Sequence, residues 1–279
     1  MVKFAINTSN SGEFADPRAV AQLAREAEEY GWDGYFLWDH IGGTSIRKGP
    51  YGDSWILLTA IAAATTRLIF GPYITPLPHR FPWVVARQAV TLDHYSSGRF
   101  FLGIGSGNDN GKEYTTFGQS ADPKTHGEQV DESLAIIVAL WSGQVVNFQG
   151  THYHIDEAQF LPIPLQQPRI PIWVAGTWPN KKPFRRAAQW DGVAPISTSG
   201  DSSLSIEECR EMIAYVRQQR ASEGAFDILC IPRPSLDKGE RRAIAAEYSD
   251  AGVTWLHYGF PRDGNIAEAQ AFIRQGPPR

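Results

Sequence analysis

An aspartate and a histidine stand side by side directly after a short apolar run. Gly34–Trp38 has the length and composition of a buried strand, and Asp39 and His40 follow it. A histidine at such a place can act as a general acid or base near neutral pH. The alternative is structural, with the carboxylate capping backbone amides and the imidazole held by a hydrogen bond. Position alone leaves both interpretations open, although barrel enzymes concentrate catalytic residues at strand ends.

A glycine-rich stretch that contains Gly103, Gly105, Ser106 and Gly107 forms the end of another apolar run. It lacks the G-x-G-x-x-G spacing of a dinucleotide-binding turn. Small residues there allow a flat ring to approach the backbone. A tight turn without any ligand is an equally good interpretation of this motif.

A third stretch, Gly176-Thr177-Trp178, lies between an apolar run and a predicted helix. Free amides at a helix N-terminus can hold a phosphate, helped by the helix dipole. Lys181 and Lys182 add positive charge nearby. A capped helix with a solvated basic face is the alternative. Trp178 also lies where an indole can stack on a flat ligand.

The elements that must position these residues alternate along the chain. Short apolar runs suit parallel strands covered on both faces, and the segments between them repeat apolar residues at helical spacing. The predicted strands are residues 3–8, 34–38, 68–76, 99–107, 172–175, 192–196, 226–231 and 254–258. The predicted helices are residues 19–30, 55–65, 82–95, 128–141, 182–190, 206–220, 240–250 and 266–274.

Eight strands alternating with eight helices predict an α/β fold, a (β/α)8 TIM barrel, and a single domain over residues 1–279. An open doubly wound sheet shares the alternation, and the count of eight favours the barrel. An insertion at residues 108–171 separates strands four and five; we expect it to contain a small hairpin, with strands at 146–148 and 152–154, and to supply a lid near the barrel mouth.

Composition narrows the class of protein. The chain has 279 residues, 42% of them hydrophobic, and a formal net charge of −4. Because its charges are spread along the chain, we expect neither nucleic acid nor a membrane as partner. Cys209 and Cys230 lack metal or redox spacing, the first ten residues lack a signal-peptide core, and no run reaches membrane-spanning length. We expect a cytoplasmic protein without a metal site.

Taken together, these motifs resemble the luciferase-like flavin-dependent oxidoreductases (bacterial luciferase-like monooxygenases). Each motif is weak alone, and their order and spacing are specific. The motifs that carry the resemblance are Trp38-Asp39-His40 and residues 67–78, 89–93, 97–99, 102–107 and 171–176.

The resemblance implies a flavin or deazaflavin lying across the carboxyl ends of the strands. It places Tyr73, Ile74 and Thr75 at a bulge against the ring, and it implies a cis peptide between Tyr73 and Ile74. It also places Ser106 and Asn108 at the ring or its ribityl chain.

For the remaining motifs, the resemblance puts Asp39 and His40 beside the reacting substrate. Gly176 and Thr177 match the phosphate-binding turn. Here the chain departs from the family, because Ala175-Gly176-Thr177-Trp178 stands where many relatives have two glycines and a serine.

The resulting functional prediction is an FMN-dependent monooxygenase acting on a small organic substrate, with reduced FMN supplied by a separate flavin reductase and a homodimer as the possible assembly. The closest alternative uses the deazaflavin coenzyme F420 and transfers a hydride without oxygen. A non-catalytic flavin-binding protein is a third choice. A barrel hydrolase using Asp39 and His40 on a metal is a fourth, and the missing ligand cluster counts against it.

Overall fold

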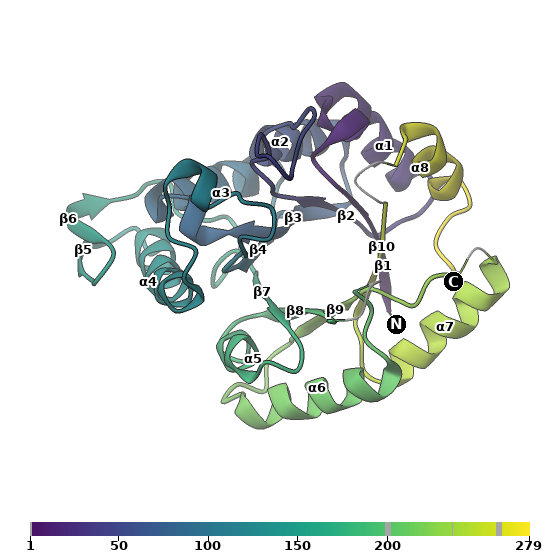
Figure 1. Cartoon of the computed structure of the whole chain (residues 1–279). Helices are drawn as coiled ribbons and strands as arrows, with labels where there is room; N and C mark the ends of the chain where they lie inside the picture. Colours follow the sequence, from purple (N-terminus) through teal and green to yellow (C-terminus); the bar gives the residue numbers. More distant parts are fainter. Residues whose placement is uncertain (1, 199–201, 236, 261–263) are drawn as a thin grey trace.

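Eight parallel strands close into a barrel in the order β1-β10-β9-β8-β7-β4-β3-β2 (Figure 1). The computed structural model describes residues 2–198, 202–235, 237–260 and 264–279. The predicted (β/α)8 barrel is therefore confirmed. The strand bounds are β1 Lys3–Thr8, β2 Gly34–Trp38, β3 Ile69–Pro76, β4 Leu102–Gly105, β7 Ile172–Thr177, β8 Gly192–Ile196, β9 Asp227–Cys230 and β10 Trp255–Gly259.

Helices lie outside the strands and cover the barrel (Figure 1). Aspartates or serines cap several of them; the side chain of Asp53, for example, accepts hydrogen bonds from the amides of Trp55 and Ile56. No described helix is long and apolar enough to cross a membrane. The helix bounds are α1 Pro17–Glu29, α2 Ser54–Ala64, α3 Pro82–Tyr95, α4 Pro123–Trp141, α5 Lys181–Ala187, α6 Ile206–Gln219, α7 Lys238–Asp250 and α8 Ile266–Ile273.

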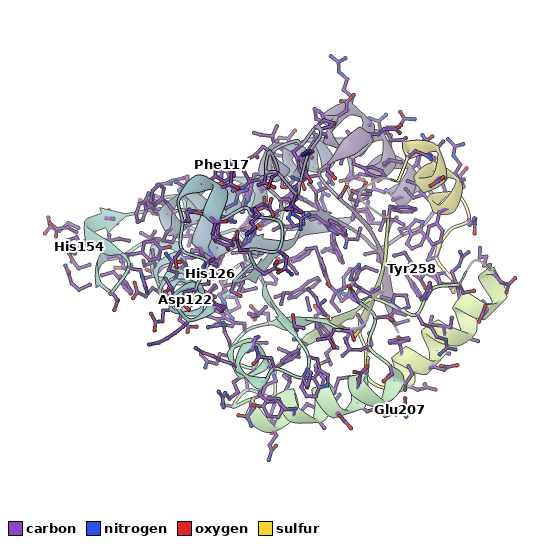
Figure 2. The ribbon with its side chains drawn as sticks, viewed as in Figure 1. Phe117, Asp122, His126, His154, Glu207 and Tyr258 are labelled. Carbon is purple, nitrogen blue, oxygen red and sulfur yellow. The ribbon has the colours of Figure 1, made fainter. Side chains whose placement is uncertain are left out.

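Side chains alternate between the two faces of each barrel strand, and β10 shows this clearly. Trp255 packs with the rings inside the barrel, whereas Leu256 belongs to the layer between strands and helices. His257 then faces inward again, against Tyr73, and Tyr258 packs outward against Trp32 (Figure 2). The interior is filled mainly by aromatic rings, so the barrel is a packed core that opens only at its mouth.

The insertion between β4 and β7 divides into two parts. Its hairpin, β5 Val145–Gln149 and β6 His154–Gln159, lies beside α4 at the far side from the barrel axis, where His154 projects outward (Figures 1 and 2). The second strand was predicted at 152–154, but it begins only at His154. The residues before it form a turn, in which the Gly150 amide donates a hydrogen bond to the Tyr153 carbonyl. The hairpin thus lies away from the barrel mouth, which residues from the first part of the insertion line instead, and the expected lid stays a prediction.

Strand β3 carries a bulge where it pairs with β2. Leu37 pairs with Pro72 and Trp38 with Ile74, so Tyr73 is the extra residue. The expected bulge is present, but the expected cis bond is wrong: the cis peptides among the described residues all precede proline, and the Tyr73–Ile74 bond is trans. The extra residue bends the strand by itself, which avoids the cost of about 2.5–4 kcal/mol of a non-proline cis bond.

Candidate active site

A cavity of about 1100 Å³ opens at the carboxyl ends of the barrel strands. All eight strands place residues around it, either at their ends or in the loops that follow. Its volume is slightly above the usual range for small-molecule and cofactor sites. Apolar side chains such as Trp38, Ile196 and Phe260 line it together with many polar residues.

His40 and Glu113 form a hydrogen-bonded pair at this mouth. The His40 Nδ1 atom lies 2.9 Å from Glu113 Oε2. The backbone amide of Gly42 donates to the other carboxylate oxygen, Oε1, at 2.8 Å, and Arg47 makes an ion pair with Oε2 at 3.0 Å. Glu113 is thus fixed from three sides, and it fixes the imidazole in turn.

The charge state of Glu113 decides which nitrogen of His40 is available for chemistry. Burial of Glu113 opposes its ionisation, but the hydrogen bonds from His40 and Gly42 and the charges of His40 and Arg47 outweigh it, and they lower its pKa to about 2. An ionised carboxylate only accepts hydrogen bonds, so His40 Nδ1 carries the hydrogen. The charged ring carries a hydrogen on both nitrogens, and when the ring is neutral Nε2 is the nitrogen that can accept a proton, which is the arrangement of a general base.

Asp39 has a different environment. Its Oδ1 and Oδ2 atoms accept from Arg80 at 2.7 and 3.0 Å, and Oδ2 also accepts from the Thr75 hydroxyl at 2.9 Å. Asp39 lines the cavity but is only 6% exposed. A buried bidentate ion pair of this kind holds β2, β3 and the following segment together.

Three polar side chains, Asn7, Tyr73 and His257, lie at the deepest part of the lining; we call them the polar floor. They are 2%, 6% and 1% exposed. Asn7 Nδ2 lies 3.2 Å from His257 Nδ1, and the rings of Tyr73 and His257 are 4.5 Å apart. Within the described chain, Asn7 Oδ1, the Tyr73 hydroxyl and His257 Nε2 have no hydrogen-bond partner.

Most of the residues that the sequence singled out do meet at this cavity, whereas Thr75 and Trp178 are not in its lining. Thr75 is fully buried, and its hydroxyl donates a hydrogen bond to Asp39. Trp178 packs against Phe184, and the Lys181 ammonium lies over its ring. The predicted residues that line the cavity are Asp39, His40, Tyr73, Ile74, Gly105, Ser106, Asn108, Gly176 and Thr177.

The glycines at the mouth have a packing explanation besides approach of a ring. A Cβ at Gly105 would lie 2.7 Å from Ile74 Cγ2, and one at Gly176 would collide with Pro183. The helix after Gly176 is also short, since α5 has seven residues and its N-cap Asn180 makes no side-chain cap. Phosphate binding at Gly176 and Thr177 therefore stays a prediction, and this short helix does not support it.

Sequence reasoning missed several lining residues. Glu113 and Arg47 lie in loops without periodic pattern, and the only signal for them was the need of His40 for an orienting carboxylate. Asn7 carried no motif at all. His257 lies in the last predicted strand, where a histidine can point into the mouth or simply be a satisfied core residue.

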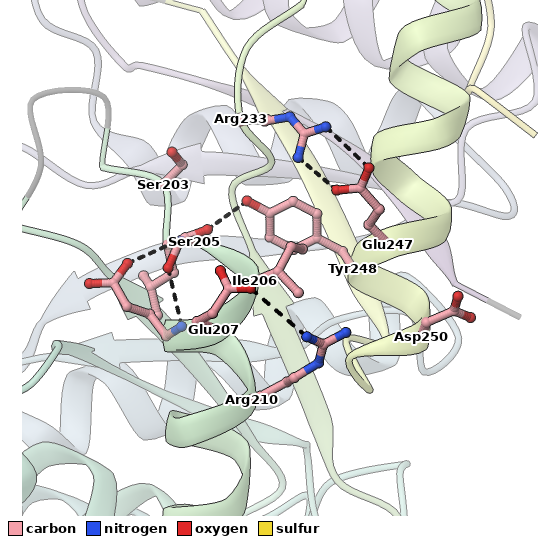
Figure 3. Close-up of a pocket in the computed structure, with 11 residues that line it drawn as sticks. Ser203, Ser205, Ile206, Glu207, Arg210, Arg233, Glu247, Tyr248 and Asp250 are labelled. Carbon is pink, nitrogen blue, oxygen red and sulfur yellow. Dashed lines mark hydrogen bonds and ion pairs between the residues drawn. The ribbon is translucent and has the colours of Figure 1, made fainter.

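A second hollow, of about 730 Å³, lies where α6 and α7 meet (Figure 3). Arg233 lines both cavities, and its guanidinium is held by the Glu247 carboxylate at 2.7 Å. Tyr248 donates to the Leu204 carbonyl, and Ser205 with Glu208 forms a capping box at the start of α6. Because these groups form hydrogen bonds or ion pairs with neighbours in the chain, we interpret the second hollow as the junction between α6 and α7.

The comparisons with known proteins agree with the fold. Residues 2–276 match the family model described as luciferase-like monooxygenase, so the chain belongs to that family. The predicted class, a luciferase-like oxidoreductase enzyme, is confirmed. Among described residues, no cluster of three or more His, Cys, Asp and Glu is placed to hold a metal ion.

The similar proteins include ones named for F420 and a solved structure with FMN. A protein of Tsukamurella paurometabola named F420-dependent glucose-6-phosphate dehydrogenase is 29% identical over 204 residues, which are 72% of this chain and 59% of that protein. The chain thus spans less than two thirds of that relative's length. A structure of an F420-dependent secondary alcohol dehydrogenase with an F420-acetone adduct superposes with a TM-score of 0.80, at 15% identity, covering 99% of this chain and 98% of the other. The oxygenating constituent of 3,6-diketocamphane monooxygenase from Pseudomonas putida, in complex with FMN, gives 0.66 at 19% identity, covering 88% and 72%.

Proposed function

We propose that this protein binds coenzyme F420 at the barrel mouth and transfers a hydride between it and a small organic substrate. The names of the curated relatives support the choice of cofactor. The observation that carries the chemistry is the hydrogen bond of 2.9 Å between His40 Nδ1 and Glu113 Oε2. It leaves Nε2 as a fixed base in the cavity lining.

The residues present fit a flavin-type ring. The cavity is large enough, its walls are mostly apolar, and the unpartnered atoms of Asn7, Tyr73 and His257 offer hydrogen bonds to a polar edge. Ile74 and Ser106 line the side where the family resemblance places the ring, and Gly176 and Thr177 line the side where it places the phosphate.

The bound deazaflavin would supply the atom that accepts or gives a hydride. The chain's own part is proton handling and orientation. As the carbon that bears the hydroxyl of an alcohol substrate gives up its hydride, His40 Nε2 takes the proton of that hydroxyl, and Glu113 holds the imidazole in place. In the reverse direction, the same nitrogen returns the proton to a carbonyl oxygen.

An FMN-dependent monooxygenase is the second candidate, and the description of the matching family model favours it. Reduced FMN would then come from a separate flavin reductase, and the apolar walls would keep water from the reacting ring.

Parallel equilibrium titrations with F420 and FMN, followed by ring absorbance and fluorescence, test the proposal. We expect one F420 site per chain with a Kd well below millimolar and weaker binding of FMN. Tighter binding of FMN, with oxygen consumption when reduced FMN is supplied, would favour the second candidate. Failure of both rings to bind would remove the cofactor assignment.

A further inference from the structure

The polar floor has hydrogen-bonding capacity that the protein does not use. We propose that Asn7, Tyr73 and His257 form a binding site for an uncharged oxygen of the ligand, a carbonyl or a hydroxyl. The inference rests on the proposed function, because it assumes that this cavity is where the ligand binds. It identifies an uncharged oxygen as the part of the ligand that lies deepest in the barrel.

The hydrogen-bond directions follow from the contacts. The Asn7 Nδ2 amide can only donate, so at 3.2 Å it makes His257 Nδ1 an acceptor. The hydrogen of the neutral imidazole is then on Nε2, which has no partner. The floor therefore presents a donor at His257 Nε2, an acceptor at Asn7 Oδ1, and the Tyr73 hydroxyl, which can do either.

Such groups are seldom left unpaired inside proteins. Buried side-chain polar atoms are hydrogen-bonded in the large majority of cases, since each unpaired one keeps its full desolvation cost. The rings of Phe36, Phe101 and Trp173 lie beneath them in the barrel. Because Asn7, Tyr73 and His257 are all in the cavity lining, we place the partners of these three atoms on the cavity side.

The charges around the cavity argue for an uncharged group. Burial lowers the pKa of His257 to about 3, so its imidazole is neutral at physiological pH. Of the guanidinium groups in the described lining, Arg47 is paired with Glu113, and Arg233 is paired with Glu247 (Figure 3). Neither is free to neutralise an anion at the floor, so a phosphate or carboxylate is a poor occupant there.

The same chemistry can come from two sources. The fused ring of a flavin or deazaflavin carries carbonyl oxygens, and an alcohol or ketone substrate carries one hydroxyl or carbonyl. Substitutions that remove only the hydrogen-bonding atom distinguish them. Tyr73→Phe is the sharpest of these, because it deletes an oxygen that has no partner within the described chain.

Tyr35→Phe is the matched control. Tyr35 is fully buried, its hydroxyl lies 3.1 Å from Thr8 Oγ1, and it is not among the lining residues. Unfolding in urea should show that Tyr35→Phe is less stable than the wild type, whereas Tyr73→Phe is equally stable or more so. A Tyr73→Phe protein destabilised as much as the control would overturn the assignment, whatever the cofactor.

Binding is measured next, by titration of each variant with F420 and with FMN, and then of the loaded protein with acetone and 2-propanol as uncharged probes. If the ring supplies the oxygen, Tyr73→Phe weakens ring binding about 3- to 10-fold, and Tyr35→Phe leaves it unchanged. If the substrate supplies it, ring binding is unchanged and probe binding weakens by that factor. His257→Leu should act like Tyr73→Phe, and His257→Gln, which keeps a donor, should recover most of the loss.

Unchanged binding of both rings and both probes in Tyr73→Phe and His257→Leu would overturn the inference while the proposed function stands. A wild-type protein that binds neither ring would remove the proposed function, and the ligand role of the polar floor with it.

Discussion

His40 and Glu113 are 73 positions apart in the sequence, and their side chains meet at 2.9 Å across the mouth of the barrel. His40 follows β2, whereas Glu113 comes from the first part of the insertion after β4. The insertion therefore contributes a side chain to the site. Since Glu113 also accepts from the Gly42 amide, it links the loop after β2 to the loop after β4.

Replacing His40 tests the proposed base. His40→Gln is close in size and still forms hydrogen bonds, so we expect a folded protein with nearly unchanged cofactor affinity. Turnover should fall about 10²- to 10⁴-fold, which is the usual contribution of a positioned acid or base. The measurements are Kd from ring fluorescence and kcat with the substrate that a screen identifies. Full activity in a folded, cofactor-loaded variant would exclude His40 from proton transfer, and a parallel loss of stability and cofactor affinity would indicate a packing role.

Removing the charge of Glu113 should change the pH dependence of stability. The folded-state pKa of about 2 lies below the ordinary value of 4.5, so this carboxylate stabilises the fold above about pH 4.5, and its contribution is lost as the pH falls toward 2. Glu113→Gln should therefore be less stable than the wild type at pH 7, with the difference shrinking at pH 3.5. Urea unfolding of both proteins at the two pH values measures this. A difference independent of pH would mean that the charge is not the cause.

The fold was predictable because its signals are local and repeat eight times. The predicted strand 34–38 coincides with β2, and the apolar spacing of residues 82–95 coincides with α3. The predicted start of the helix at residue 128 was wrong because a cap had been overlooked: α4 begins at Pro123, where the Asp122 side chain accepts from the amides of Lys124 and Thr125. Its apolar periodicity, the signal used for the prediction, starts several residues later.

The site was only partly predictable, since its pairings join distant positions. His40 stands at a strand end and could be found there. Its partner Glu113 lies in a loop, and the partner of Asp39 is Arg80, 41 positions further on. The cis bond expected from the resemblance was wrong because the bulge at Tyr73 already bends β3. Strand position thus identifies residues at the mouth, but it does not show which of them are neutralised by a neighbour.

The pair between Asp39 and Arg80 should contribute mainly to stability. The Asp39 side chain is 3% exposed and that of Arg80 is 19% exposed, so removing the arginine leaves a buried carboxylate without its counter-charge. We expect Arg80→Met to lower the free energy of unfolding by about 3–5 kcal/mol. The double variant Asp39→Asn with Arg80→Met should recover part of this loss, because no unpaired charge remains. A double variant that is destabilised by the full sum of the single losses would contradict the pairing.

Gly103 provides a last test, which separates packing from ligand contact at the glycine-rich strand end. A Cβ at this position would collide with the carbonyl oxygens of Pro72 and Tyr73 in β3. Because these are backbone atoms, the two strands must separate to admit it, and we expect Gly103→Ala to cost about 3 kcal/mol or more of stability without any ligand. Gly127→Ala is the control: in α4 the added Cβ meets only side-chain ends at 3.6 and 3.7 Å, and alanine in a helix should add about 0.5–1 kcal/mol. Urea unfolding of the ligand-free proteins checks both. If Gly103→Ala unfolds like the wild type and loses only cofactor affinity, the glycine is required for approach of the ring and not for the pairing of β3 with β4.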